Sequence, residues 1–139
     1  MTIHPSSKIH NGHSEVVSRS DGIIQVNATD HIYSIEDIKA NTRSIGDLKN
    51  KHKTLVLVIT SQYSDIDIDA RHFASTPEAM KYSIAEAYVI RSFAQRLIAN
   101  FTLKFKGFSV PVKFFNEIEP AVEWLKTFEQ NNHITKQLP

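Results

Sequence analysis

The sequence contains no cysteine, which excludes disulfide bonds, thiol catalysis, iron–sulfur clusters and zinc sites built on cysteine. It has no hydrophobic run that approaches the roughly 20 residues of a membrane-spanning helix. Residues 1–12 show no apolar signal-peptide core. The 16 basic and 15 acidic residues nearly balance, whereas nucleic-acid-binding proteins usually carry a much larger basic excess. We therefore expect a cytoplasmic protein that binds no nucleic acid and does not span a membrane.

The remaining composition is typical of an ordinary globular domain. Hydrophobic residues make up 41% of the 139-residue chain and charged residues 22%, so a core can form without a metal or disulfide. Polar residues dominate 1–13, which we expect to be a flexible tail, followed by one domain over 14–130 and a frayed C-terminus over 131–139. His10 and His13 have a spacing that can hold a metal on a helix, but we interpret them as scattered residues of the tail.

Local signals in the first half predict a hairpin, a helix and a buried strand. Asp21-Gly22 lies between two β-branched runs, and this dipeptide favours a hairpin turn because glycine tolerates positive φ. Ser34 followed by Asp37 is the pattern of a capping box at the start of a helix. The aliphatic run over 54–60 predicts a strand at the centre of a parallel sheet.

The second half alternates between strands and helices. Residues 84–90 and 110–115 predict strands, the second at a sheet edge because it contains Pro111. Helices are expected after Ser92 and after Asn116. The first of these helices carries an apolar stripe expected to face the core: Phe93, Leu97, Ile98, Phe101 and Phe105. We predict an α/β fold with a mixed, mostly parallel sheet of about five strands, an N-terminal hairpin and about four helices.

Packing motifs along this order resemble the STAS domain, and in particular the small bacterial SpoIIAA-like proteins often described as STAS/SEC14. The residues that carry the resemblance are Ala70-Arg71, Phe73-Ala74, Asn100-Phe101, Pro111, Phe114-Phe115, Ala121 and Trp124-Leu125. The resemblance covers 14–130 and implies a STAS fold with a regulatory role exerted through protein contacts. The STAS anti-sigma-factor antagonists are phosphorylated on a serine of an Asp-Ser-Ser-Gly-like segment. The corresponding residues 67–70 contain neither serine nor glycine, so we expect no partner switch of that kind.

Acidic residues gather in one loop that follows the predicted central strand. In open parallel sheets, ligands usually bind beyond the carboxyl ends of the strands, which selects three loops: 61–68, 91–92 and 116–117. The acidic segment 65–69 suits a hard cation, but it lacks the glycine and the glutamate of an EF-hand loop. We interpret it as a solvated loop in which Asp69 caps the next helix, and we keep Asp67 and Asp69 as candidate binding residues.

Two arginines are the other candidate binding residues. Arg71 lies in the first turn of the helix expected after Asp69, over residues 70–75, where the helix dipole disfavours a cation. It could pair with Asp67 or Glu78, reach a ligand or contact a partner subunit. Arg91 and Ser92 could bind an anion at a helix start, although a serine cap beside an exposed arginine accounts for the same residues.

No complete catalytic or metal-binding set appears in the sequence, which contains no Gly-x-Ser-x-Gly elbow and no glycine-rich phosphate loop. We therefore expect a non-enzymatic STAS-like module without a cofactor or metal, acting through protein contacts and forming a homodimer. The alternative is a carrier of a small apolar or lipid-like ligand, because the second half is rich in phenylalanine. The third and weakest hypothesis is a hydrolase that uses Asp65, Asp67 and His72.

Overall fold

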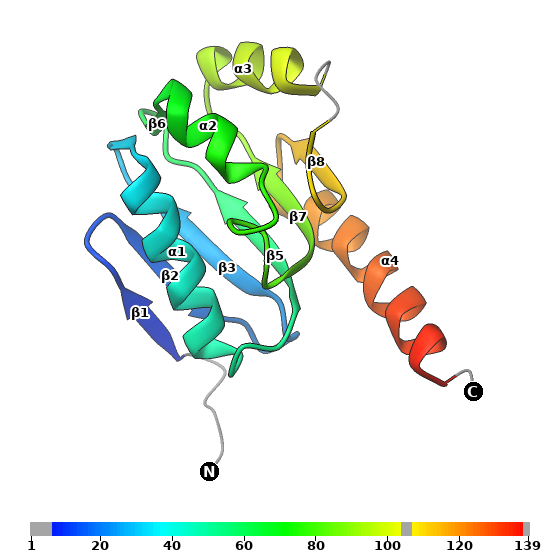
Figure 1. The fold of residues 1–139 in the computed structure, drawn as a ribbon. Helices are drawn as coiled ribbons and strands as arrows, with labels where there is room; N and C mark the ends of the chain where they lie inside the picture. Colours follow the sequence, from blue (N-terminus) through cyan, green and yellow to red (C-terminus); the bar gives the residue numbers. More distant parts are fainter. Residues whose placement is uncertain (1–6, 104–106, 138–139) are drawn as a thin grey trace.

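The computed structural model describes residues 7–103 and 107–137 and has an α/β fold (Figure 1). Its main sheet has six strands in the order β1-β2-β3-β5-β7-β8. These strands are β1 (Lys8–His10), β2 (Ser14–Ser18), β3 (Ile24–Ala28), β5 (Thr54–Ile59), β7 (Ser83–Val89) and β8 (Val112–Phe115). The β1–β2 and β2–β3 pairs are antiparallel, and the other three pairs are parallel. The predicted mixed, mostly parallel sheet is confirmed, with six strands instead of about five.

Two further strands and four helices complete the described part of the chain. A small parallel sheet pairs β4 (Ile32–Tyr33) with β6 (Asp65–Ile66). The helices are α1 (Ile35–Leu48), α2 (Ile68–Ala74), α3 (Phe93–Leu103) and α4 (Ile118–Gln137). Helices α1 and α4 pack on opposite faces of the main sheet, because each contributes to a different one of the two core clusters.

The central strand β5 divides the core between the two faces of the sheet. It pairs in parallel with β3 on one side and β7 on the other, which confirms the position predicted for residues 54–60. Leu55 and Leu57 pack with the α4 residue Leu125, whereas Val56 packs with Ile45 of α1. This alternation follows from the two-residue period of a strand and requires helices on both faces.

The predicted local signals form as expected. The Asp21-Gly22 turn joins β2 to β3, and Gly22 has a φ of 87°. Ser34 is the N-cap of α1: its hydroxyl accepts from the backbone N–H of Asp37, whose carboxylate accepts from the backbone N–H of Ser34. Helix α1 therefore begins where the capping box places it.

Both ends of the chain differ from expectation. Lys8–His10 forms edge strand β1, so the predicted tail over 1–13 is wrong for these residues, and residues 1–6 lie outside the described part. The strand is held by backbone ladder bonds to β2, which composition does not reveal. The C-terminal residues predicted to fray continue α4 as far as Gln137, and residues 138–139 lie outside the description.

Helix α3 presents a different face to the protein from the one predicted. Phe93 is 76% exposed and Leu97 is 54% exposed, whereas Gln95 and Ala99 are buried. The buried Gln95 side chain accepts from the Thr60 hydroxyl at 2.8 Å and donates to two backbone carbonyls of the loop after β5. These polar bonds orient the helix so that Phe93 and Leu97 face outward, whereas Ile98 of the same predicted stripe is half-buried. The side chains of Phe101 and Phe105 lie outside the described set.

Candidate functional site

A cavity of about 200 Å³ lies between one face of the main sheet and helices α1, α2 and α3. The sheet contributes apolar side chains that include Val26, Val56, Val58 and Phe114. The helices contribute Ile38, Ile45, Ala74, Ile98 and Ala99. Alanines on α2 and α3 are too short to fill the space over the sheet, and an apolar enclosure of this kind suits a small organic ligand.

Arg71 of α2 reaches this cavity, and its side chain bonds to no other residue of the described ranges. It lines the cavity, and its Nε atom is buried and forms no hydrogen bond. Within the described residues, its side chain forms no ion pair with either predicted partner, Asp67 or Glu78. The carboxylate of Asp67 instead accepts the backbone N–H of Ala70 at 2.8 Å. The guanidinium group is therefore available to an anion that enters the cavity.

A buried acid also lines the cavity. Glu86 on β7 is 6% exposed, and its carboxylate accepts hydrogen bonds from the hydroxyls of Ser83 and Tyr88, each at 2.7 Å. Burial raises the pKa of Glu86 above its usual value, although both hydrogen bonds oppose this shift. Burial, with the nearby charge of Glu86, raises the pKa of Tyr88 well above its usual value. Tyr88 is thus a neutral hydrogen-bond donor over the physiological pH range.

Arg71 was among the predicted candidate residues, whereas Glu86 and Gln95 were not predicted. Glu86 interrupts the apolar strand 84–90, and a single acid within a buried strand is a signal for a functional or hydrogen-bonded carboxylate. Gln95 lies at the cavity wall beside Thr60, but its role depends on a loop 31 to 35 residues away in sequence. No local pattern could have identified it.

The acidic loop has a different role from the one predicted. Asp67, not Asp69, is the N-cap of α2, so the prediction for Asp69 was wrong. The backbone N–H of Asp67 donates to the Tyr33 carbonyl, extending the β4–β6 pairing, and the helix begins directly afterwards. Asp69 is exposed in the first turn of α2. Among the described residues, Asp65, Asp67 and His72 do not form a metal-ligating group.

Arg91 and Ser92 lie outside the cavity lining. The Ser92 hydroxyl accepts the backbone N–H of Gln95 at 3.1 Å, which makes it the cap of α3. The Gln95 side-chain oxygen accepts the backbone N–H of Arg91 at 2.7 Å, and the Arg91 side chain is exposed. These bonds occupy two N–H groups that an anion would need. Of the five candidate binding residues, Arg71 is therefore the one at the cavity.

Comparison with known proteins places the chain in a family. The family model described as Domain of unknown function (DUF7793) matches residues 17–129, and the chain belongs to this family. No curated protein and no solved structure matches the chain. None of the helices in the described part combines the length and hydrophobicity needed to cross a bilayer.

Proposed function

For this member of the DUF7793 family, we propose that the cavity under α1, α2 and α3 binds a small, mostly apolar molecule with one anionic group. The observation that carries the proposal is the unpartnered, buried Nε of Arg71 in an apolar cavity. A buried polar group without a hydrogen bond costs about 1–3 kcal/mol of stability. We infer that an acceptor atom of the ligand forms the hydrogen bond that the Arg71 Nε lacks. The protein carries or senses this ligand without transforming it.

The size of the cavity limits the ligand class. An engineered apolar cavity of about 150 Å³ holds one benzene molecule. A cavity of about 200 Å³ therefore fits on the order of ten non-hydrogen atoms, the size of an aromatic or short branched carboxylate. Ligands of drug size need roughly 300–1,000 Å³, so a whole lipid exceeds this space. Within the carrier hypothesis, this favours a small apolar acid over a lipid-like molecule.

Two probes of the same size test the proposal. Phenylacetate and phenylacetamide differ in charge but not in shape, and both match the cavity. In isothermal titration calorimetry, we expect the carboxylate to bind at least about tenfold more tightly than the amide, because only the carboxylate forms a charge-assisted bond with Arg71. Arg71→Met should remove this difference, and the exposed Arg91→Met should preserve it.

A cavity-filling variant provides the second arm of the test. Ala74→Leu places a larger side chain in the cavity wall and should weaken both probes. If neither probe binds and native mass spectrometry of the purified protein shows no bound small molecule, the proposal is refuted. An equal affinity for the two probes would refute the role of Arg71.

A second candidate function is favoured by the outward face of α3. We propose that a STAS-type fold acts through protein contacts and that Phe93 and Leu97 contact a second copy of this chain. These residues lie four apart on one helix face, and both are large, apolar and exposed. The formal net charge of +1 provides little electrostatic repulsion between copies.

The oligomeric state tests this second proposal. We expect multi-angle light scattering to detect a dimer that Leu97→Lys converts to a monomer. The control is Arg96→Lys on the same helix, which keeps an exposed positive charge and should preserve the dimer. A wild-type protein that stays monomeric at millimolar concentration would exclude self-association through α3.

A further inference from the structure

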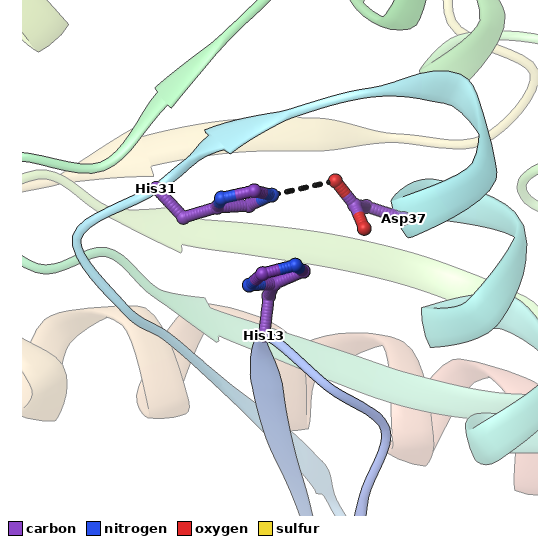
Figure 2. Close-up of side chains that lie close together, drawn as sticks. All are labelled: His13, His31 and Asp37. Atoms are coloured by element: carbon purple, nitrogen blue, oxygen red, sulfur yellow. Dashed lines mark hydrogen bonds and ion pairs between the residues drawn. The ribbon is translucent and has the colours of Figure 1, made fainter.

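Two histidines from separate loops lie close to an aspartate of α1 (Figure 2). His13 precedes β2, His31 precedes β4, and Asp37 lies in the first turn of α1. Their potential ligand atoms all lie within 4.8 Å of one another. The two imidazole rings stack with centroids 3.4 Å apart, and Nε2 of His31 lies 2.8 Å from Oδ2 of Asp37.

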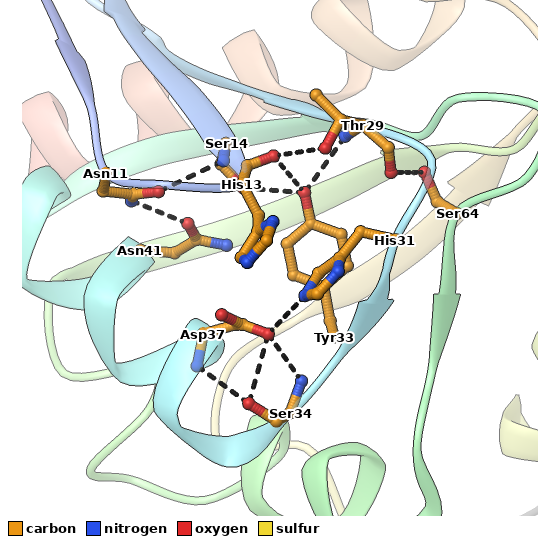
Figure 3. Close-up of polar contacts among 10 residues, drawn as sticks. All are labelled: Asn11, His13, Ser14, Thr29, His31, Tyr33, Ser34, Asp37, Asn41 and Ser64. Atoms are coloured by element: carbon orange, nitrogen blue, oxygen red, sulfur yellow. Dashed lines mark hydrogen bonds and ion pairs between the residues drawn. The ribbon is translucent and has the colours of Figure 1, made fainter.

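A hydrogen-bond network holds the backbones of the two histidines together (Figure 3). The buried Tyr33 hydroxyl donates to the His13 carbonyl at 2.7 Å and accepts the backbone N–H of Thr29 at 3.0 Å. The Thr29 hydroxyl donates to the same His13 carbonyl at 2.6 Å. The Tyr33 ring also packs edge-on against the His31 ring, with centroids 5.0 Å apart. The turn that carries His13 is therefore fixed beside the loop that carries His31.

The cluster still has free ligand atoms. Oδ2 of Asp37 accepts from His31 and from the backbone N–H and hydroxyl of Ser34, which fixes the orientation of the carboxylate. Its Oδ1 accepts no hydrogen bond from the described residues. The His13 ring is exposed and likewise has no hydrogen bond within the described part of the chain. One oxygen and one imidazole are thus unused beside an oriented His31.

We propose that His13, His31 and Asp37 bind a divalent transition-metal ion such as Zn²⁺. Imidazole nitrogen and carboxylate oxygen are preferred ligands of Zn²⁺, and three protein ligands leave a fourth position for water. This site is separate from the ligand cavity, because none of the three side chains lines it.

Metal binding requires a small rearrangement. Zn–N and Zn–O bonds of about 2.1 Å place tetrahedral ligand atoms about 3.4 Å apart, closer than the outer limit of 4.8 Å here. The two imidazole rings are nearly parallel, so their nitrogen lone pairs lie in separate, nearly parallel planes and do not converge on one ion. The exposed His13 side chain can supply the change by rotating its ring toward the carboxylate, while the bonds to Ser34 hold Asp37 in place.

Calorimetric titration of the full chain with ZnCl₂ at neutral pH tests the proposal. We expect one ion per chain, with affinity reduced by more than about tenfold in His13→Ala, because this change removes one of three ligands. The matched control is His10→Ala, three residues earlier, whose exposed ring lies 3.5 Å from Glu15 and not in the cluster. Co²⁺ should give visible absorption bands of a four-coordinate site in the wild type and lose them in His13→Ala.

Three further results test whether His13 binds the metal and whether the metal site is independent of the cavity. Because His13 is exposed, His13→Ala should keep the fold, and circular dichroism verifies this. Absence of Zn²⁺ binding to the wild type would overturn the proposal, as would equal affinity in wild type and His13→Ala. Zn²⁺ affinity unchanged in Arg71→Met would support a site independent of the cavity, so this inference and the proposed ligand function can fail separately.

Discussion

Replacing Arg71 by methionine should stabilise the protein while removing its preference for an anionic ligand. Most arginines that contact the interior are paired, and truncating them costs stability. The buried Nε of Arg71 has no hydrogen bond, and within the described residues its guanidinium has no ion-pair partner. Methionine keeps the unbranched apolar stem that packs against the cavity wall and removes the unsatisfied donor.

The expected gain in stability follows from the free-energy cost of leaving the Arg71 Nε donor without a hydrogen bond. A buried unsatisfied polar group costs about 1–3 kcal/mol, and the lower half of this range applies because the Arg71 side chain is only half-buried. We therefore expect Arg71→Met to raise the free energy of unfolding by about 1–2 kcal/mol. Unfolding entropy of about 2.1 cal/mol/K per residue over 139 residues converts this into a rise in Tm of about 3–7 °C.

Urea denaturation followed by circular dichroism measures the change, with the ligand-free protein prepared by dialysis. The control is Arg91→Met, because Arg91 is exposed and should change stability by less than about 0.5 kcal/mol. A loss of stability above about 1 kcal/mol in Arg71→Met would refute the reasoning, since it would mean that the guanidinium has a structural partner.

Three further tests address other features of the structure. Glu86→Gln should flatten the pH dependence of the free energy of unfolding. Because the pKa of Glu86 is raised in the folded state, its protonated carboxyl contributes fully to stability below about pH 4.5, and this contribution is lost as pH rises through the folded-state pKa. In urea titrations from pH 5 to 8, the stability of the variant should therefore rise relative to that of the wild type. Leu125→Ala should lower the free energy of unfolding by about 2–5 kcal/mol because the Leu125 side chain is fully buried. Leu97→Ala, on the exposed face of α3, should lower it by less than about 1 kcal/mol. Equal losses in the two variants would contradict the orientation of α3. Asp67→Ala should cost about 1 kcal/mol as the loss of an N-cap, and Asp69→Ala less than about 0.5 kcal/mol, measured by thermal unfolding; the reverse order would restore Asp69 as the cap.

The proposed ligand cavity and the proposed metal site are connected through Tyr33. Tyr33 lines the ligand cavity, and its hydroxyl also holds the backbone of His13 in the proposed metal cluster. An ion that draws His13 toward Asp37 acts on a residue tied to the cavity wall. Measuring phenylacetate affinity with and without Zn²⁺ shows whether the two sites are coupled, because any coupling must be the same in both directions.

The sequence was sufficient to predict the features that local interactions decide. The hairpin at Asp21-Gly22 and the capping box of Ser34 and Asp37 form because the residues that specify each turn are neighbours in the chain. The central position of residues 54–60 follows from an apolar run that must be covered on both faces. The general α/β architecture then follows from the alternation of strands with helices.

Only the tertiary structure decided which polar groups meet. Phe93 and Leu97 of helix α3 face outward because Gln95 bonds to a distant loop, an interaction that helical periodicity cannot express. Asp67 caps a helix, and no hydrogen bond or ion pair joins the Arg71 side chain to another residue of the described ranges. His13 meets His31 across 18 residues because Tyr33 and Thr29 fix the turn between them. Each of these side chains had several possible partners in the sequence, and the geometry of the packed loops selected among them.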